Sequence, residues 1–436
     1  MMLVSRPGEP DSLVVTGARV VDPGQAVDAT LDVVVDSGII SSLEPEGSSR
    51  PNGHRVVDGR GLVLAPAFVD PHVHLRTPGR EDEETIRSGT EAAAAGGFCA
   101  LLAMPNTEPV VDSAAVLGAL VETAREEAEV PVGFLAAISK RQEGGELTEM
   151  VELAEAGAAG FTDDGRPVAS PGLMRRALQY HALTKRRLAV HCEEQTLSRD
   201  GQMHEGAISA ELGFAGYPSV AESVMVERDL ALAAYEQQPL HLLHLSARES
   251  VDALRAAQAA GVRATAEVTP HHLCLSDEAL RELDPNLKMN PPLRSSDDRS
   301  ALVAAVRDGT IEAVATDHAP HARHEKEVPF EAAPFGVTGL ETAFAALNTN
   351  LVEQGLISLS TLLDRMSAGP ARIYGLEPPK IAVGAEANLV LIDLRERWAV
   401  QEQSFRSRSV NSWLVGQELV GRVRLTVAGG RVAFAA

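Results

Sequence analysis

Cysteine is scarce in this chain, with three residues in 436, namely Cys99, Cys192 and Cys274. They lie far apart and their number is odd, which excludes a disulfide framework and a zinc module built from cysteine pairs. No apolar run approaches the ~20 residues that a membrane span needs. The opening residues, MMLVSRPGEPDSL, lack the apolar core of a signal peptide. These absences predict a soluble, cytoplasmic protein.

Basic residues are in the minority. The chain has 39 Lys and Arg against 61 Asp and Glu, which gives a net charge of −22. This balance argues against nucleic acid or an anionic membrane as a partner, because both require a basic face. Hydrophobic residues make up 44% of the chain and can form a sizeable core. The length allows two or three domains, or one large barrel with an appendage.

Apolar and polar residues alternate in short stretches near both ends of the chain. A period of two is typical of half-buried strands. The stretches cover residues 12–46, 387–393, 418–429 and 430–435. The sequence therefore predicts a small β-sandwich domain formed from both termini, residues 1–61 plus 374–436.

Residues 62–373 follow a different rhythm, in which compact apolar runs alternate with Ala- and Glu-rich helical stretches. Several helical stretches close on glycine just before the next apolar run, as in AAAAGGF and AVRDGTIEAVATD, and glycine commonly ends helices. Eight strand–helix units with apolar strands predict an α/β fold, a (β/α)₈ TIM barrel. The expected strands cover residues 62–70, 98–104, 130–138, 158–164, 187–193, 240–246, 262–269 and 311–317.

Histidines and aspartates collect at the ends of five of these strands, where barrel enzymes carry their catalytic groups. Residues i and i+2 of a strand share a face, so His72 and His74 point the same way. The further members of the set are His191, His244, Asp317 and one of the neighbours Asp163 and Asp164. Imidazoles and carboxylates are the ligands of zinc and related ions, and a two-metal site needs about this many.

The motifs around these residues resemble dihydroorotases of the bacterial single-function type, in the amidohydrolase superfamily. The resemblance rests on FVDPHVHLR, MPNT, GFTDDG, VHCE, HLLHLS, EVTPHHL, KMNPPLR and ATDHAPH. It implies interconversion of dihydroorotate and N-carbamoyl-aspartate in pyrimidine synthesis. It also implies two zinc ions per chain, one of them held weakly. Their ligands would be His72, His74, Asp164 and Asp317 for the first ion, with Asp164 bridging to a second ion on His191 and His244.

The bridging ligand needs a comparison of candidates. Many relatives use a carboxylated lysine at the end of the fourth strand, but none of the five lysines of this chain lies there. Lys140 comes nearest and is expected in a solvated loop. Side chains alternate along a strand, so only one of Asp163 and Asp164 can face the metals. The family pattern favours Asp164 and leaves Asp163 an orienting or structural role.

A substrate that carries a carboxylate is well matched by the fork of an arginine. Arg76 lies two residues beyond His74, on the same face if the strand continues. Asp317 is expected to take a proton from the attacking water and to return it to the leaving ring nitrogen. The family carries further substrate contacts at the positions of His74, Asn106, Asn290, His321, Phe335 and Gly336.

Three other functions share the expected fold. A hydantoinase or allantoinase has no need of a carboxylate receptor, and Arg76, Asn106 and Asn290 count against it. A non-catalytic scaffold bound to aspartate transcarbamoylase would have lost metal ligands, and a deaminase would normally lack the bridging arrangement. We expect a homodimer and leave association with aspartate transcarbamoylase open. The acidic run GREDEET, residues 79–85, is expected to be a solvated helix start.

Overall fold

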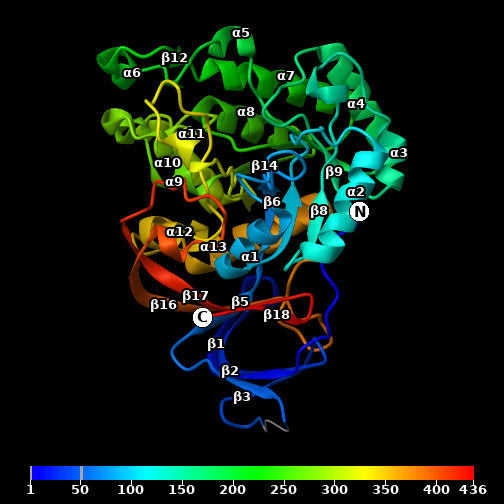
Figure 1. Ribbon diagram of the computed structural model, residues 1–436, viewed down its shortest axis with the longest axis vertical. Helices are drawn as coiled ribbons and strands as arrows, with labels where there is room; N and C mark the ends of the chain where they lie inside the picture. Colours follow the sequence, from blue (N-terminus) through cyan, green and yellow to red (C-terminus); the bar gives the residue numbers. More distant parts are fainter. Residues whose placement is uncertain (1, 50–52) are drawn as a thin grey trace.

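The computed structural model describes residues 2–49 and 53–436 and has a mixed α/β fold (Figure 1). A mixed sheet from both ends of the chain lies at the bottom of Figure 1, and parallel strands surrounded by helices lie above it. Within the described ranges, no helix combines the length and the apolar character that crossing a bilayer requires.

Eight strands from the middle of the chain pair in parallel and in sequence order. A bridge from Ala136 to Phe161 links the first three to the other five, and a bridge from Val73 to His318 links the last to the first. The pairings therefore run in a closed circuit, with all carboxyl ends at one edge. The strands are β6 (Phe68–Val73), β7 (Phe98–Ala103), β8 (Val132–Phe134), β9 (Gly160–Phe161), β10 (Arg187–Val190), β13 (Leu240–Leu242), β14 (Ala264–Val268) and β15 (Ala313–Val314).

The stretch expected to be the first of these strands, residues 62–70, is two strands. Its first part, β5 (Val63–Pro66), pairs with the terminal sheet, whereas β6 begins at Phe68 and pairs with β7. Pro66 has no N–H to donate to a continuing ladder, and the chain leaves the terminal sheet at this point. A continuous apolar run did not reveal this change of sheet.

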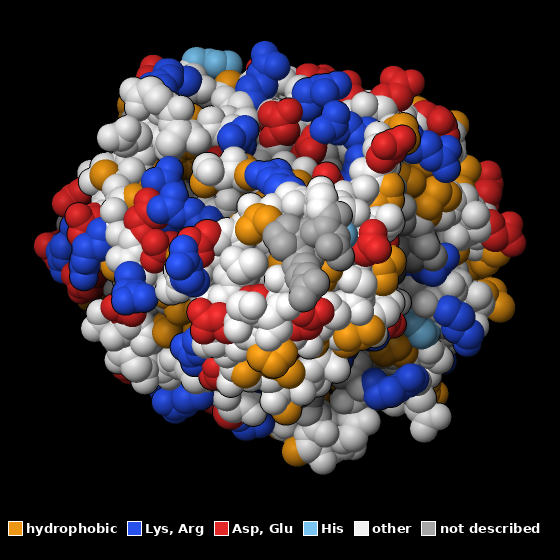
Figure 2. Space-filling view, turned by 90° about the horizontal axis from the view of Figure 1, so that it is seen from below, with side chains coloured by type: hydrophobic (Ala, Val, Ile, Leu, Met, Phe, Trp, Pro, Cys, Tyr) orange, Lys and Arg blue, Asp and Glu red, His pale blue; other side chains and the backbone are white. Residues whose placement is uncertain are grey.

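The terminal sheet combines strands from both ends of the chain and encloses its own apolar cluster, which includes Val15, Ile40 and Leu391. The face seen from below carries interspersed basic and acidic side chains (Figure 2). In sheet order the strands are β18 (Arg431–Ala435), β17 (Glu418–Ala428), β16 (Leu389–Ala399), β5, β1 (Leu13–Asp22), β2 (Val27–Asp36) and β3 (Ile39–Pro45), with β4 (Arg55–Asp58) paired to β1.

Helices connect the parallel strands, and two of them end as predicted, at Gly97 and Gly309, with φ of 93° and 91°. Glycine adopts this left-handed conformation without steric cost. The helices of eight or more residues are α1 (Ile86–Gly96), α2 (Ala114–Glu127), α4 (Pro171–Thr184), α7 (Val220–Glu236), α8 (Arg248–Ala259), α10 (Ser296–Asp308) and α13 (Leu359–Met366). The shorter ones are α3 (Met150–Glu155), α5 (Gln195–Ser198), α6 (Ala207–Leu212), α9 (Pro270–Cys274), α11 (Arg323–Lys326), α12 (Ala343–Leu347) and α14 (Ala368–Tyr374).

Phe68 joins three elements at the base of the parallel strands. Its ring is fully buried, stacks on Phe344 of α12 at 5.5 Å and meets Phe98 of β7 edge-on at 5.6 Å. We expect Phe68→Ala to lower the free energy of unfolding by about 3–5 kcal/mol, because it leaves a cavity between these rings. Urea-induced unfolding measures the loss, and Phe68→Leu should cost less. A loss below about 1 kcal/mol for the alanine variant would contradict this packing.

Candidate active site

The six predicted metal ligands lie at the carboxyl ends of five parallel strands. Each follows or ends a strand that is otherwise apolar, so the polar side chains emerge at one edge. All six are buried. They are His72 and His74 from β6, Asp164 after β9, His191 after β10, His244 after β13 and Asp317 after β15.

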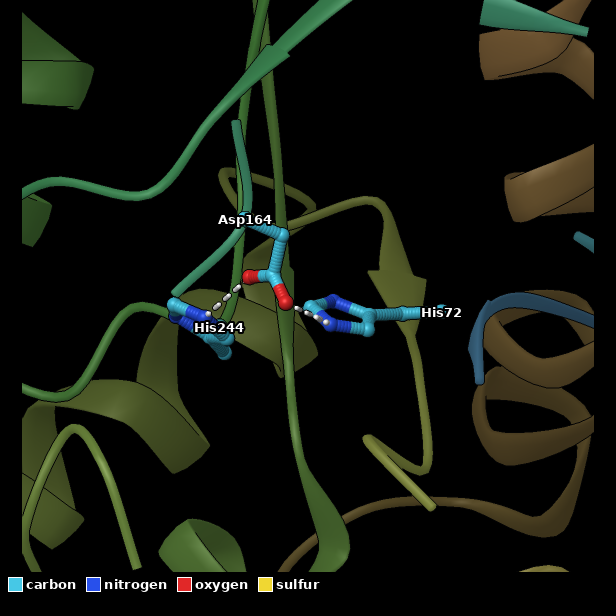
Figure 3. A group of neighbouring side chains, drawn as sticks. All are labelled: His72, Asp164 and His244. Carbon is cyan, nitrogen blue, oxygen red and sulfur yellow. Dashed lines mark hydrogen bonds and ion pairs between the residues drawn. The ribbon is translucent and has the colours of Figure 1, made fainter. Parts of the chain in front are cut away.

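The Asp164 carboxylate lies between two pairs of imidazoles, and Figure 3 shows it between His72 and His244. Its Oδ2 is 3.5 Å from Nε2 of His72 and 3.5 Å from Nε2 of His74. Its Oδ1 is 3.4 Å from Nε2 of His244 and 3.8 Å from Nδ1 of His191. Each carboxylate oxygen therefore faces a different pair of histidines, which is the arrangement of a bridging ligand.

Asp317 forms a second group of donors with His72 and His74. Its Oδ1 is 3.1 Å from Nε2 of His74 and 3.4 Å from Nε2 of His72. Ligand atoms of His72, Asp164 and His244 lie within 4.8 Å of one another, as do those of His72, His74 and Asp317. Within the described ranges, the buried Nε2 of His72 has no hydrogen-bond partner. This donor set suits a divalent cation of the zinc type.

The charges of the site favour a cation. Burial would raise the pKa of Asp164, but the neighbouring imidazoles, His72 above all, lower it well below its usual range. Burial would also lower the pKa of His72, and Asp164, Asp317 and Glu267 instead raise it well above the usual value. The negative potential that stabilises a proton on the imidazole also favours a divalent cation, which binds the imidazole in its neutral form.

Glu267 of β14 contacts the site and was missed by the sequence reasoning. Its side chain is fully buried; its Oε1 is 2.7 Å from Nδ1 of His72 and its Oε2 is 3.0 Å from Nε2 of His241. Burial opposes the ionised form, yet His72 and His241 lower the pKa of Glu267 to about 2. A carboxylate on Nδ1 leaves Nε2 of His72 to face the aspartates. The available signal was an acidic residue inside the apolar strand ATAEV.

Two further polar residues fix the orientation of the other imidazoles. Nδ1 of His74 is 2.9 Å from Oδ1 of Asn106, which leaves Nε2 to the carboxylates. Nε2 of His191 is 3.0 Å from Oε2 of Glu193, so His191 presents Nδ1 instead. The same Glu193 oxygen accepts a 3.1 Å hydrogen bond from Nδ2 of Asn290. Glu193, too, was not among the predicted residues.

The alternatives for the bridging position lie elsewhere. Asp163 accepts hydrogen bonds from the backbone N–H groups of Ile138, at 2.8 Å, and Ser139, at 3.1 Å. The Lys140 side chain is 40% exposed and pairs with Glu146 at 2.8 Å. Asp163 therefore orients the loop after β8, and the aspartate among the histidines is Asp164.

A cavity of about 380 Å³ opens onto these residues. A Cβ at Gly336, where φ is +129°, would meet Ala319 at 2.8 Å and His321 at 3.0 Å, so a larger residue would distort the wall. The lining combines five of the six predicted metal ligands with every predicted substrate contact: His74, Arg76, Asn106, Asp164, His191, His244, Asn290, Asp317, His321, Phe335 and Gly336.

Arg76 reaches the cavity from a turn, because the strand does not continue as far as this residue. β6 ends at Val73, and Arg76 has a φ of +59°, in the left-handed region. Its Nε lies 3.0 Å from Oε2 of Glu83 and donates a 3.1 Å hydrogen bond to the carbonyl of Pro320. The positive φ turns the side chain from the strand direction into the cavity.

The acidic run at residues 79–85 is only partly the solvated helix start that was predicted. Glu81 and Asp82 are exposed, and Thr85 caps α1. Glu83 and Glu84, however, are fully buried. Glu83 meets Arg76, and Oε2 of Glu84 lies 3.2 Å from Nε2 of His318, next to Asp317 in the chain. Basic partners inside the fold account for their burial.

We expect Glu267→Gln to weaken divalent metal binding by about 10–100-fold, because His72 loses the carboxylate that orients it. Competition with a chelator measures the affinity. The matched control is Glu249→Gln, at an exposed position in the first turn of α8, which should leave the affinity unchanged. Equal affinities for the Glu267 variant and the unaltered protein would contradict the role of Glu267.

Known proteins resemble this chain over almost its whole length. The family model described as Dihydro-orotase-like matches residues 61–250. The dihydroorotase of Syntrophus aciditrophicus is 44% identical over 422 residues, which cover 97% of this chain and 99% of that protein. The dihydroorotase of Geobacter metallireducens is 42% identical and is covered equally well, at 97% and 99%.

Solved structures give the same picture of the fold. The L-hydantoinase (dihydropyrimidinase) of Arthrobacter aurescens superposes with a TM-score of 0.86 at 25% identity, over 97% of this chain and 96% of that one. The dihydropyrimidinase of Brevibacillus agri superposes with a TM-score of 0.83 at 22% identity, over 97% of this chain and 94% of that one. With relatives above 40% identity along nearly its full length, this chain belongs to the dihydroorotase family.

Proposed function

We propose that this chain catalyses the reversible, metal-assisted hydrolysis of the cyclic amide of (S)-dihydroorotate to N-carbamoyl-L-aspartate in pyrimidine synthesis. The observation that carries the proposal is one cavity that joins a donor set for divalent metal to an arginine suited to a carboxylate. The relatives named dihydroorotase support the same activity. Hydantoinase activity is the alternative, and Arg76 in the cavity wall counts against it.

The donor set fits two zinc ions. His72, His74 and Asp317 would hold one, His191 and His244 would hold the other, and Asp164 faces both groups. Zinc supplies a Lewis acid that polarises a carbonyl and lowers the pKa of a bound water to about 7. Glu267, Asn106 and Glu193 are the residues that keep the imidazoles in the required orientation.

Asp317 is the general base and acid of this proposal. Its Oδ1 lies at the cavity, 3.1 Å from His74, and accepts the proton of the attacking water. It then returns that proton to the ring nitrogen that leaves as the amide bond breaks. Ring closure in the biosynthetic direction passes through the same states in reverse.

Arg76 and Asn290 would bind the substrate at the cavity wall. The Arg76 guanidinium replaces the lost hydration of the substrate's carboxylate with charge-assisted hydrogen bonds. Oδ1 of Asn290 is buried and has no hydrogen-bond partner within the described residues, so it is placed to accept a ring N–H. The remaining contacts are assigned to His74, Asn106, His321, Phe335 and Gly336.

The same proposal extends to the architecture. The closed circuit of eight parallel strands supports a (β/α)₈ barrel over residues 62–373, and the sheet from both termini supports a small β-sandwich domain, to which β5 adds a strand. A homodimer, association with aspartate transcarbamoylase and a cytoplasmic location stay predictions.

The activity is tested with zinc-loaded protein and dihydroorotate, with hydantoin, dihydrouracil and allantoin assayed in parallel. We expect dihydroorotate to have the highest kcat/KM and elemental analysis to find up to two zinc ions per chain. Treatment with a chelator should abolish turnover, and zinc should restore it. Faster turnover of hydantoin than of dihydroorotate would replace the proposal with its alternative.

The role of Asp317 is tested by Asp317→Asn, which keeps the size of the side chain and removes its basicity. A general base usually contributes about 10²–10⁴-fold to kcat. We expect kcat to fall by more than that contribution, because the substitution also changes a proposed metal ligand. The matched control, Asp297→Asn at an exposed position of α10, should retain full activity. A variant of Asp317 with kcat within about 10-fold of the unaltered protein would exclude this residue as the base.

A further inference from the structure

Glu83 lies at the centre of a buried ionic network beside the cavity. Its side chain is fully buried, although it belongs to an acidic surface turn between β6 and α1. Its Oε2 is 3.0 Å from Nε of Arg76, and its Oε1 is 2.5 Å from Nη2 of Arg80 and 3.1 Å from Nδ1 of His321. One carboxylate thus holds two residues of the cavity wall, Arg76 and His321.

The contacts of Arg76 leave one side of its guanidinium available. Nε donates a 3.1 Å hydrogen bond to the carbonyl of Pro320 and forms an ion pair with Glu83, whose Oε2 lies 3.0 Å away and has no hydrogen-bond partner among the described residues. Within the described residues, the two terminal nitrogens of Arg76 make no hydrogen bond. The side chain is only 10% exposed and lines the cavity. The contacts at Nε therefore hold the Arg76 guanidinium on one side and leave Nη1 and Nη2 available for a ligand.

His321 is the second cavity residue that contacts the Glu83 carboxylate. Its Nδ1 faces Glu83, and its Nε2 is 2.8 Å from the carbonyl of Phe335. Arg76 belongs to the turn after β6. His321 follows β15 and lies 245 residues later in the chain (321 minus 76). Glu83 therefore sets the positions of two cavity groups that no local sequence could align.

A cation site is the other use that this cluster suggests. Ligand atoms of Glu83, His321 and Glu325 lie within 4.8 Å of one another. Arg80, however, lies 2.5 Å from both Glu83 and Glu325, and Arg76 lies 3.0 Å from Glu83. The two arginines already supply the positive charge that a metal would bring, so the geometry favours an ion-pair network.

We propose that Glu83 is a positioning residue that makes the cavity selective for substrates carrying a carboxylate, by holding Arg76 with its terminal nitrogens toward the cavity. The inference rests on the proposed function, because it concerns the substrate class of the same site. An uncharged cyclic amide has no group for those nitrogens, so it gains nothing from their alignment. Glu83 itself touches neither the substrate nor the reacting atoms.

The first test is Glu83→Gln, which retains the size of the side chain and removes its charge. We expect KM for dihydroorotate to rise about 10-fold or more, while kcat changes by less than about 3-fold and zinc content is unchanged. Glu83→Asp keeps the charge but is one methylene shorter, so it should recover part of the loss. Asp82→Asn is the matched control, with the same charge change at an exposed neighbour, and should leave KM unchanged.

The second test asks whether Glu83 acts through Arg76. As a single change, with Arg76 present, Glu83→Gln should raise the dissociation constant of orotate, a planar pyrimidine carboxylate, about 10-fold, as measured by calorimetry. In an Arg76→Met background the same change should have less than about a 3-fold effect on kcat/KM, because the group that it positions is gone. Additive effects in the double variant would overturn the inference and assign Glu83 a general structural role.

The two proposals fail in different ways. A zinc-loaded, unaltered protein that neither turns over dihydroorotate nor binds orotate would remove the proposed function, and the inference with it. An active protein whose Glu83→Gln variant keeps the same KM and the same affinity for orotate would remove the inference alone.

Discussion

Two buried aspartates share one edge of the parallel strands with four imidazoles, and much of the structure serves to make that possible. Asp164 and Asp317 would raise each other's pKa in a buried site without positive charge beside them. The imidazoles of His72 and its neighbours lower the pKa of both aspartates. Glu267 and Glu193 fix the rings of His72 and His191 from outside. The orientation of the donor atoms therefore depends on these neighbouring residues as well as on the strands.

The backbone at the site is strained where the strands end. Arg76, His244 and Asp317 have φ of +59°, +27° and +48°, values that side chains with a Cβ rarely adopt. A left-handed residue of this kind costs roughly 1–2 kcal/mol and persists only where the surroundings impose it. β13 stops at Leu242 and β15 at Val314, so short strands leave room for these turns. The left-handed backbone at these three residues turns their side chains away from the strand direction, and all three line the cavity.

Local patterns predicted most of the parallel strands and the grouping of histidines and aspartates at their ends, because both follow from periodicity and from where parallel strands end, whereas the choice of Asp164 over Asp163 came from the family resemblance. His191 and Asp317, for example, each close an apolar run. Burial of the acidic residues could not be predicted in this way. Glu267 meets His72 across 195 residues of chain, and Glu84 meets His318 across 234. An acidic residue is expected at the surface unless it has a basic partner inside the fold. A partner that is distant in the sequence cannot be recognised from local patterns.

The segment after β16 connects the terminal sheet to the substrate side of the cavity. Oγ of Ser407 donates to Oε2 of Glu84 at 2.5 Å, and Oγ of Ser409 donates to the backbone carbonyl of Glu83 at 2.7 Å. Asn411 accepts from the backbone N–H of His321 at 3.0 Å and donates to the carbonyl of Gly336 at 3.2 Å. The same short segment therefore holds the acidic turn that pairs with Arg76 and the part of the cavity wall at His321 and Gly336. Through this segment between β16 and β17, the terminal sheet thus supports cavity residues that are proposed to bind the substrate.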